Sequence, residues 1–212
     1  IKDFHGHPLI AHTILQARDS GIFDTVYIST DCPEIASIAL KYGAKVPFLR
    51  PAELAADDAP EWEAWRHAVK ELEKRHKGGK YAIVSLPCTS PLRSLNDIRN
   101  TVKIYDENTF DMVMCVTEAE RNPWFNMVVK DKVGKIDVVN KTSHPLHRRQ
   151  DAPTVYDLTT VCNVFDPYFV LRCDSHFQGK IGCHVVDRLS AVDIDTQFDF
   201  DVAEFLFEKY RT

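Results

Sequence analysis

The chain alternates between blocks with a helical spacing of apolar residues and short blocks of β-branched and aromatic residues. The first helical block begins after Pro8 and closes at Gly21, and the second begins at Pro33 and closes at Gly43. Between them, residues 25–30 are β-branched, aromatic or hydroxyl-bearing, which predicts a buried strand. The chain is therefore expected to start as helix, strand, helix.

The alternation continues to the end of the chain. Further helices are predicted at residues 62–76 and 95–105, from Pro167 onward, and at residues 197–210. Further strands are predicted at residues 45–48, 81–86, 111–116 and 161–165, and around Val185. Strands and helices in turn are typical of a layered α/β fold with a mostly parallel sheet.

One segment, about residues 121–157, breaks this pattern. Short apolar runs on either side of Gly134 predict an antiparallel ribbon, and a polar, basic loop follows it. An insertion of this kind often builds a subunit contact or a lid. We therefore expect residues 1–212 to form a single domain with one inserted ribbon.

Composition narrows the classes of function. The 212 residues include 26 Lys and Arg against 31 Asp and Glu, a formal charge of −5, which argues against a nucleic-acid coat or a protein that binds anionic membranes. A basic pocket remains compatible with this balance. No apolar run approaches the ~20 residues of a membrane span, so no transmembrane segment is predicted.

The 6 cysteines are scattered singly and form no C-x-x-C pair, which favours reduced thiols in a cytoplasmic protein over a disulfide framework. A zinc site drawn from Cys173, His176, Cys183 and His184 matches no standard ligand spacing. The sequence begins at Ile1 and not at a methionine, so it says nothing about a targeting peptide.

Two polar loops follow predicted strands, at the ends where ligands of open α/β sheets bind. In residues 50–59, Arg50 suits a phosphate or base contact, although a solvated linker has the same composition. In residues 87–93, the hydroxyls of Thr89 and Ser90 and the charge of Arg93 precede a helix start that favours anions. A plain helix cap explains the serines of this second loop equally well.

A third loop carries two aspartates two residues apart. In an extended segment Asp193 and Asp195 face the same side while Ile194 points to the core. Mg²⁺ typically takes one or two carboxylates together with substrate phosphates, so this pair is a candidate metal site. Thr196 and Asp199 instead have the spacing of a capping box, so Asp199 is assigned to the following helix.

The predicted ribbon segment contains a further basic pair, Arg148 and Arg149, followed by Gln150 and Asp151. Arginine forks suit planar carboxylates, but adjacent arginines are more often part of a solvated loop.

Taken together, these loops resemble those of the CMP-sialic acid synthetases, the acylneuraminate cytidylyltransferases. Each motif alone is weak, whereas the set, in order and at separations like those of the family, is specific. The motifs are Phe4-His5-Gly6-His7-Pro8-Leu9-Ile10, Ser29-Thr30-Asp31, Phe48-Leu49-Arg50-Pro51-Ala52-Glu53-Leu54-Ala55, Thr89-Ser90-Pro91-Leu92-Arg93, Arg148-Arg149-Gln150-Asp151 and Asp193-Ile194-Asp195-Thr196.

The resemblance implies a Rossmann-like three-layer fold and a cytoplasmic homodimer whose ribbon reaches toward the neighbouring site. It implies the reaction of CTP with a nonulosonic acid to give the CMP-sugar and pyrophosphate, with Mg²⁺ and with no nucleic-acid or membrane partner. The implied roles are nucleotide binding by Arg50, Asp57, Ala59, Thr89 and Ser90, substrate binding by Arg149, Gln150, Thr89 and Ser90, metal binding by Asp193 and Asp195, and catalysis by Asp193, Asp195 and Arg149.

The sequence departs from the family's pattern in places. The family's glycine- and basic-rich nucleotide loop, with the strand before it, belongs immediately ahead of Ile1, and we expect the protein to carry both there. Pro87-Cys88, Asn122-Pro123 and Thr159-Thr160 replace the usual residues where the sugar should lie. A legionaminic, pseudaminic or other 3-deoxy-ulosonic acid, octulosonate included, therefore fits as well as N-acetylneuraminate, and a non-catalytic relative that binds nucleotide or only dimerises is the alternative.

Overall fold

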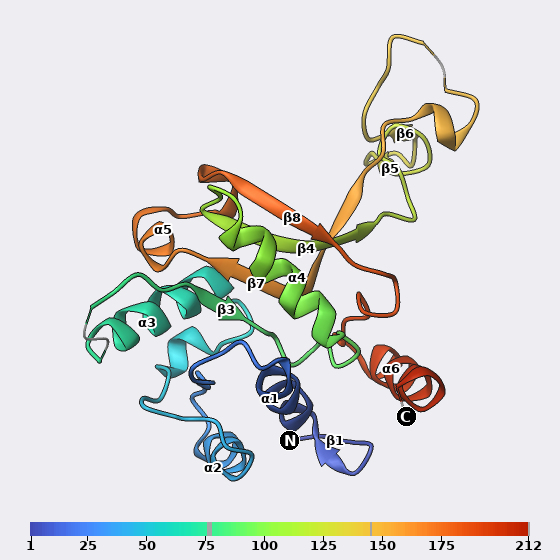
Figure 1. Ribbon diagram of the computed structural model, residues 1–212. Helices are drawn as coiled ribbons and strands as arrows, with labels where there is room; N and C mark the ends of the chain where they lie inside the picture. Colours follow the sequence, from blue (N-terminus) through green and yellow to red (C-terminus); the bar gives the residue numbers. More distant parts are fainter. Residues whose placement is uncertain (76–77, 145, 212) are drawn as a thin grey trace.

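The computed structural model describes residues 1–75, 78–144 and 146–211, and its helices follow the predicted order (Figure 1). The helices are α1 (Leu9–Ser20), α2 (Pro33–Lys41), α3 (Glu61–Glu73), α4 (Leu95–Asp106), α5 (Pro167–Arg172) and α6 (Gln197–Tyr210). The strands are β1 (Asp3–Phe4), β2 (His7–Pro8), β3 (Ile83–Ser85), β4 (Met112–Glu118), β5 (Val128–Lys130), β6 (Ile136–Val138), β7 (Tyr156–Phe165) and β8 (Ile181–Val185). The end of the predicted helix at residues 62–76 lies outside the described residues.

The central sheet has the strand order β3-β7-β4-β8. Strand β7 is antiparallel to both β3 and β4, and β8 is parallel to β4. Strands β3, β4 and β8 therefore run in one direction and β7 in the other. The α/β prediction is confirmed, but the sheet is mixed because β7 returns between two parallel strands.

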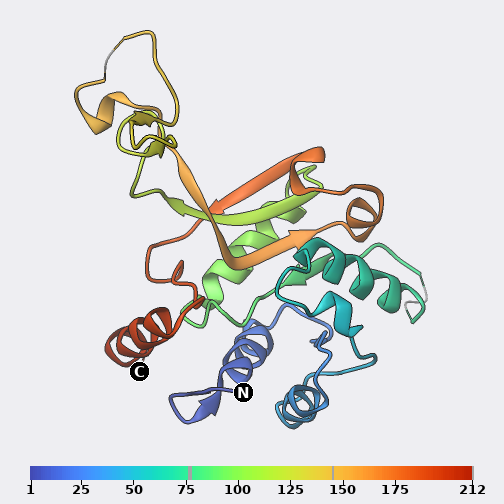
Figure 2. The same ribbon diagram turned by 180° about the vertical axis from the view of Figure 1, so that it is seen from behind.

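Two helices cover opposite faces of this sheet, as the alternation of side chains along a strand requires. On one face Trp62 and Trp65 of α3 pack against Met112 of β4 and Phe165 of β7. On the other face Val102, from α4, packs among buried side chains of β4 and β7. The arrangement is helix, sheet, helix, with the core on both sides of β4 and β7 (Figure 2).

The predictions of a buried strand at residues 25–30 and of a short strand at residues 45–48 are wrong. The two segments share a single parallel bridge, Tyr27 to Lys45, with a hydrogen bond from Ile28 N–H to the Lys45 carbonyl at 2.9 Å. Tyr27 is 41% exposed. Val26 and Ile28 are partly buried against a core cluster that contains Ile14, but among the described residues no strand extends along the other edge of this segment.

Local sequence signals set several helix ends as predicted. Gly21 ends α1 in the left-handed conformation, with φ of 71°. The Thr196 hydroxyl accepts a hydrogen bond from Asp199 N–H, and Asp199 reaches back to the Thr196 backbone, which is the capping box expected for α6. Ser94 and Asp97 form the same box at α4.

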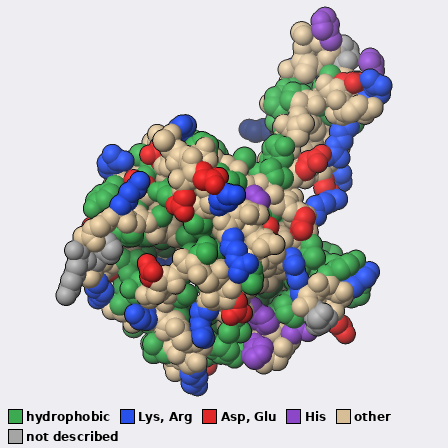
Figure 3. All heavy atoms as spheres, in the orientation of Figure 1, with side chains coloured by type: hydrophobic (Ala, Val, Ile, Leu, Met, Phe, Trp, Pro, Cys, Tyr) green, Lys and Arg blue, Asp and Glu red, His purple; other side chains and the backbone are tan. Residues whose placement is uncertain are grey.

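The arm, which we define as residues 121–155, projects from the sheet between β4 and β7 (Figures 1 and 2). Its strands β5 and β6 form an antiparallel ribbon with Val128 opposite Val138. The buried side chain of Asn122 ties its base, donating to the Pro153 carbonyl at 2.8 Å and accepting from Trp124 N–H at 3.0 Å. Apolar side chains lie exposed along the arm (Figure 3).

All six cysteines are free thiols. In the part of the chain that the structure describes, no helix combines the length and the apolar character that crossing a membrane requires.

Candidate active site

The second and third loops predicted from the sequence lie against each other. The N–H of Ile194 donates to the carbonyl of Thr89 at 2.9 Å. The loops follow β3 and β8, which run in the same direction, so both leave the sheet at the carboxyl ends of these strands. Ile194 packs against the core cluster that contains Phe4 and Phe200. This places the backbone of the Asp-x-Asp segment directly on the Thr89 loop.

The two predicted metal-binding aspartates have different surroundings. The Oδ1 atom of Asp193 is buried and has no hydrogen-bond partner within the described part of the chain, whereas Asp195 is exposed. An orphaned carboxylate oxygen beside an open carboxylate suits a hydrated Mg²⁺ ion that also binds substrate phosphates. No cluster of three or more metal-ligating side chains occurs among the described residues, which also leaves the considered zinc site unsupported.

The second loop is fixed by hydrogen bonds to its neighbours. Ser90 is fully buried, and its hydroxyl lies 2.6 Å from the hydroxyl of Thr160 on β7. Ser90 therefore does not cap α4, since Ser94 does so. Thr89, by contrast, is partly exposed at the point where the third loop docks. Of the two hydroxyls predicted to contact a ligand, the structure leaves that of Thr89 the more accessible.

Cys88 and Arg93 complete this loop below its surface. Burial raises the pKa of the Cys88 thiol, which stays protonated at neutral pH. Arg93 is 2% exposed, and its Nε donates to the Ser90 carbonyl at 2.9 Å. Burial lowers the pKa of the Arg93 guanidinium to about 10, so it remains charged at neutral pH.

The first loop approaches the same region through its connection to α3. Arg50 N–H donates to the Thr30 carbonyl at 2.8 Å, and Arg50 Nε is buried without a hydrogen-bond partner. Asp57 is exposed and Ala59 is partly exposed in the loop that follows. Desolvation raises the pKa of the Glu61 carboxyl at the start of α3, and the Asp193 carboxylate raises it further. Glu61 and Asp193 are therefore near enough to interact electrostatically.

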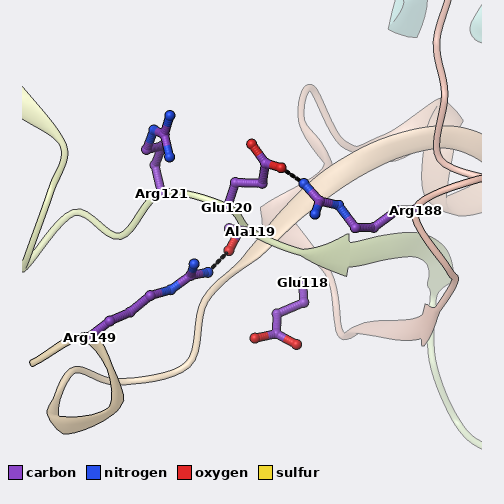
Figure 4. A pocket seen from close by; sticks show the side chains of 6 residues that line it. All are labelled: Glu118, Ala119, Glu120, Arg121, Arg149 and Arg188. Atoms are coloured by element: carbon purple, nitrogen blue, oxygen red, sulfur yellow. Dashed lines mark hydrogen bonds and ion pairs between the residues drawn. The ribbon is translucent and has the colours of Figure 1, made fainter.

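The two adjacent arginines of the arm, Arg148 and Arg149, have different surroundings. Arg148 forms a bidentate ion pair with Asp151, with bonds of 3.0 Å and 2.8 Å, so it is the solvated loop arginine that its sequence suggested. Arg149 instead points back to the sheet and donates to the Ala119 carbonyl (Figure 4). It lines a polar pocket of about 340 Å³ together with Glu118, Glu120, Arg121 and Arg188. Gln150 lines the adjoining pocket.

The structure thus assembles the predicted residues in two groups. The Thr89 and Asp193 loops are in contact, and the Arg50 loop leads to Glu61, which interacts electrostatically with Asp193. Arg149 and Gln150 lie on the arm. No hydrogen bond or ion pair between described residues joins the two groups.

Several contacts beside the site were not predicted from the sequence. Thr160 was expected near the sugar, but its hydrogen bond with the Ser90 hydroxyl, 70 residues away, was not expected. Glu61 is merely the first residue of a helix in the sequence, and nothing local marks its approach to Asp193. Arg188 and Glu120 face each other as an ion pair at the rim of the arm pocket (Figure 4). None of these carries a motif, because each depends on a contact between distant segments.

A solved structure, 4-diphosphocytidyl-2C-methyl-D-erythritol synthase from Anaerococcus prevotii, superposes with a TM-score of 0.68 over 97% of this chain and 91% of the other, at 14% identity. At that identity the likeness shows a shared α/β fold and no more. The sequence comparisons are more specific, since a family model described as cytidylyltransferase matches residues 1–207.

Three relatives are similar over nearly the whole chain. The post-translational flagellin modification protein B of Campylobacter coli is 36% identical, covering 99% of this chain and 88% of that protein. The CMP-N,N'-diacetyllegionaminic acid synthase of Campylobacter jejuni is 36% identical, covering 97% and 86%. A pseudaminic acid cytidylyltransferase of Campylobacter jejuni is 30% identical, covering 98% and 88%. The chain belongs to the cytidylyltransferase family.

Proposed function

We propose that this protein activates a nonulosonic acid with CTP, giving the CMP-sugar and pyrophosphate. The observation that carries the proposal is the docking of the Asp193–Asp195 loop on Thr89, which joins the candidate metal site to the candidate nucleotide loop. The relatives named as legionaminic and pseudaminic acid enzymes support a nonulosonic acid as the acceptor. Among these sugars, the legionaminic and pseudaminic types are favoured over N-acetylneuraminate because the more similar relatives carry those names.

In this proposal the core loops hold the nucleotide. Arg50 and the loop through Asp57 and Ala59 bind the cytidine, and Thr89 with the buried Ser90 shapes the junction between nucleotide and sugar. The sugar's anomeric hydroxyl oxygen forms a bond to the α-phosphorus, the bond from that phosphorus to the β-phosphate oxygen breaks, and pyrophosphate leaves. The hydroxyl proton passes to a carboxylate of the site or to water. Holding the two reactants in line supplies much of the rate.

Asp193 and Asp195 would hold Mg²⁺ on the triphosphate. The unpartnered Oδ1 of Asp193 and the exposed carboxylate of Asp195 fit this role. A bound ion neutralises charge that builds on the phosphate oxygens as pyrophosphate leaves.

The sugar's carboxylate would bind Arg149 and Gln150. These two residues lie on the arm, away from the loops of their own core, so we propose that the protein is a homodimer in which each arm serves the neighbouring site. The exposed apolar residues of the ribbon support this, since a two-stranded ribbon is marginal alone and exposed apolar surface favours a partner. These residues are Met127, Val128, Val129, Val133, Ile136 and Val139.

Adjacent arginines on the arm provide a matched test of the sugar site. Arg149→Ala should raise the KM for the sugar acid by about tenfold or more, because a charge-assisted bond to a carboxylate is lost. The KM for CTP should stay unchanged. Arg148→Ala, which removes only the ion pair with Asp151, serves as the control. Steady-state kinetics with each substrate varied in turn measures both, and an unchanged sugar KM in Arg149→Ala removes Arg149 from the site.

A further inference from the structure

Arg93 is an almost fully buried cation beneath the Thr89 loop. Its Nε donates to the Ser90 carbonyl at 2.9 Å, and its Nη2 donates to the Pro87 carbonyl. Its Nη1 is buried and has no hydrogen-bond partner among the residues that the structure describes. Two nitrogens of the guanidinium therefore hold the loop by hydrogen bonds, and the third nitrogen makes none to the described residues.

The charge of Arg93 also lacks a direct partner. Among the described residues no carboxylate forms an ion pair with it, and it is 2% exposed. Removing a charge from water costs several kcal/mol per ion, and arginine is almost never fully buried unless it is paired. The Asp193 carboxylate favours the charged form of Arg93, but without an ion pair. If Asp193 binds a cation, even that attraction is offset.

The position of Arg93 indicates where the missing negative charge would come from. The loop that it holds, residues 87–90, is the loop on which Ile194 docks at the carboxyl ends of the strands. An anion bound at Thr89 would lie over a fixed positive charge in surroundings of low dielectric, where such a charge acts more strongly than in water.

We infer that Arg93 is a positioning residue that fixes the Thr89 loop and supplies a buried positive charge beneath an anionic part of the substrate. It acts through the loop and through its electrostatic field, without touching the substrate. Under the proposed function, on which this identification rests, the anionic part is the polyphosphate of CTP.

Substitutions that keep or remove the charge of Arg93 separate the effect of its electrostatic field from its effect on the shape of the loop. Arg93→Lys keeps the charge, whereas Arg93→Gln removes it and keeps a side chain that can donate to one carbonyl. With Mg²⁺ present, calorimetry should give a Kd for CTP within about threefold of the wild type for Arg93→Lys and at least about tenfold weaker for Arg93→Gln. Both melting temperatures are measured alongside.

Arg211 provides the matched control, because it donates to the next part of the same loop, the Leu92 carbonyl, at 2.7 Å. Arg211→Gln should lower the melting temperature while leaving the Kd for CTP within about threefold of the wild type. A purely structural role for Arg93 predicts that Arg93→Lys and Arg93→Gln weaken CTP binding equally, or that neither does. Either result overturns the inference.

Two further readouts keep the outcomes distinct. If Arg93→Gln does not fold, Arg93→Lys decides, since a folded Arg93→Lys variant with a tenfold weaker Kd for CTP contradicts a role for the charge. The series is repeated with inorganic triphosphate. A wild-type chain that binds triphosphate but not CTP contradicts the proposed function alone, and the series is then judged on triphosphate. A wild-type chain that binds neither overturns both proposals.

Discussion

At the scale of single residues, neighbouring aspartates of one short segment have separate tasks. Asp199 is used by the helix, because its Oδ2 accepts from Thr196 N–H at 2.7 Å and from the Thr196 hydroxyl at 2.6 Å. Those bonds lower the pKa of Asp199, with the hydroxyl contact the main cause. Asp195 keeps an exposed carboxylate four residues earlier. The division follows from capping geometry, which fixes the third residue of a helix.

This division predicts opposite outcomes for two matched substitutions. Asp195→Asn should reduce kcat by about hundredfold or more, since it removes a ligand of the proposed metal, and should leave the melting temperature unchanged. Asp199→Asn should lower the melting temperature and retain turnover. Pyrophosphate release measures turnover, and thermal unfolding measures the melting temperature. Normal turnover in a folded Asp195→Asn variant would exclude the metal assignment.

The role of a residue could be predicted from the sequence where it depends on near neighbours in the chain. The capping box of Thr196 and Asp199, the glycine at Gly21 and the inward side chain of Ile194 are set within a few residues, so their pattern predicts them. The Ser90–Thr160 bond and the lack of an ion partner for Arg93 depend on segments far apart in the chain. No local pattern records them.

At the scale of elements, the hairpin of β1 and β2 contacts α1 and α6 through histidine side chains. His12 of α1 donates from Nε2 to the Phe4 carbonyl at 2.7 Å, and its ring meets Phe4 and Phe207 edge-on. Burial lowers the pKa of His12, and the charges of His7 and His5 lower it further, while the Phe4 carbonyl and Asp3 oppose the shift. The folded state therefore favours neutral His12.

The sign of this shift predicts a loss of stability in acid. Because the unfolded chain binds the proton more readily, the stability is complete above the ordinary pKa of 6.5 and falls as the pH drops through the lower folded value. His12→Asn should make the melting temperature fall less between neutral pH and about pH 5. His176, whose pKa burial also lowers, leaves a residual slope. An identical slope in His12→Asn and wild type would contradict the assignment.

At residues 25–30 the composition predicted a strand, but among the described residues no second strand extends along this segment. β-propensity expresses packing against neighbours on both sides, and a single bridge to Lys45 does not enclose Tyr27. The helices were predicted more closely, because a helix completes its hydrogen bonds within itself. Residues 197–210, for instance, are α6 as expected.

At the scale of the whole molecule, the structure of a single chain does not explain why the arm exposes apolar side chains. Val128 and Ile136 lie on the same face of the ribbon and are 52% and 61% exposed. Lysine at both positions should convert the proposed dimer to a monomer, because each charge would have to be buried against the partner. Leu40→Lys on α2 is the control outside the arm. Sedimentation velocity measures the change, and a wild-type monomer would contradict the dimer.

The overall architecture was the most predictable level, since alternating helices and strands admit few arrangements. The antiparallel course of β7 was not predicted, because direction depends on how the arm returns the chain to the sheet. The contact between the Thr89 and Asp193 loops agrees with their predicted positions after strands of the sheet. The sequence did not show that Arg149 and Gln150 lie apart from those loops in one chain.

The most direct test of the central claim is pyrophosphate release from CTP and Mg²⁺, with legionaminate, pseudaminate, N-acetylneuraminate and 3-deoxy-octulosonate assayed in parallel. We predict that pyrophosphate is released in the presence of a legionaminic or pseudaminic type of acid and that none is released from CTP alone. Release only with octulosonate would move the protein to another sugar-acid class. No release with any of the four, from full-length protein that binds CTP, would contradict the proposed activity.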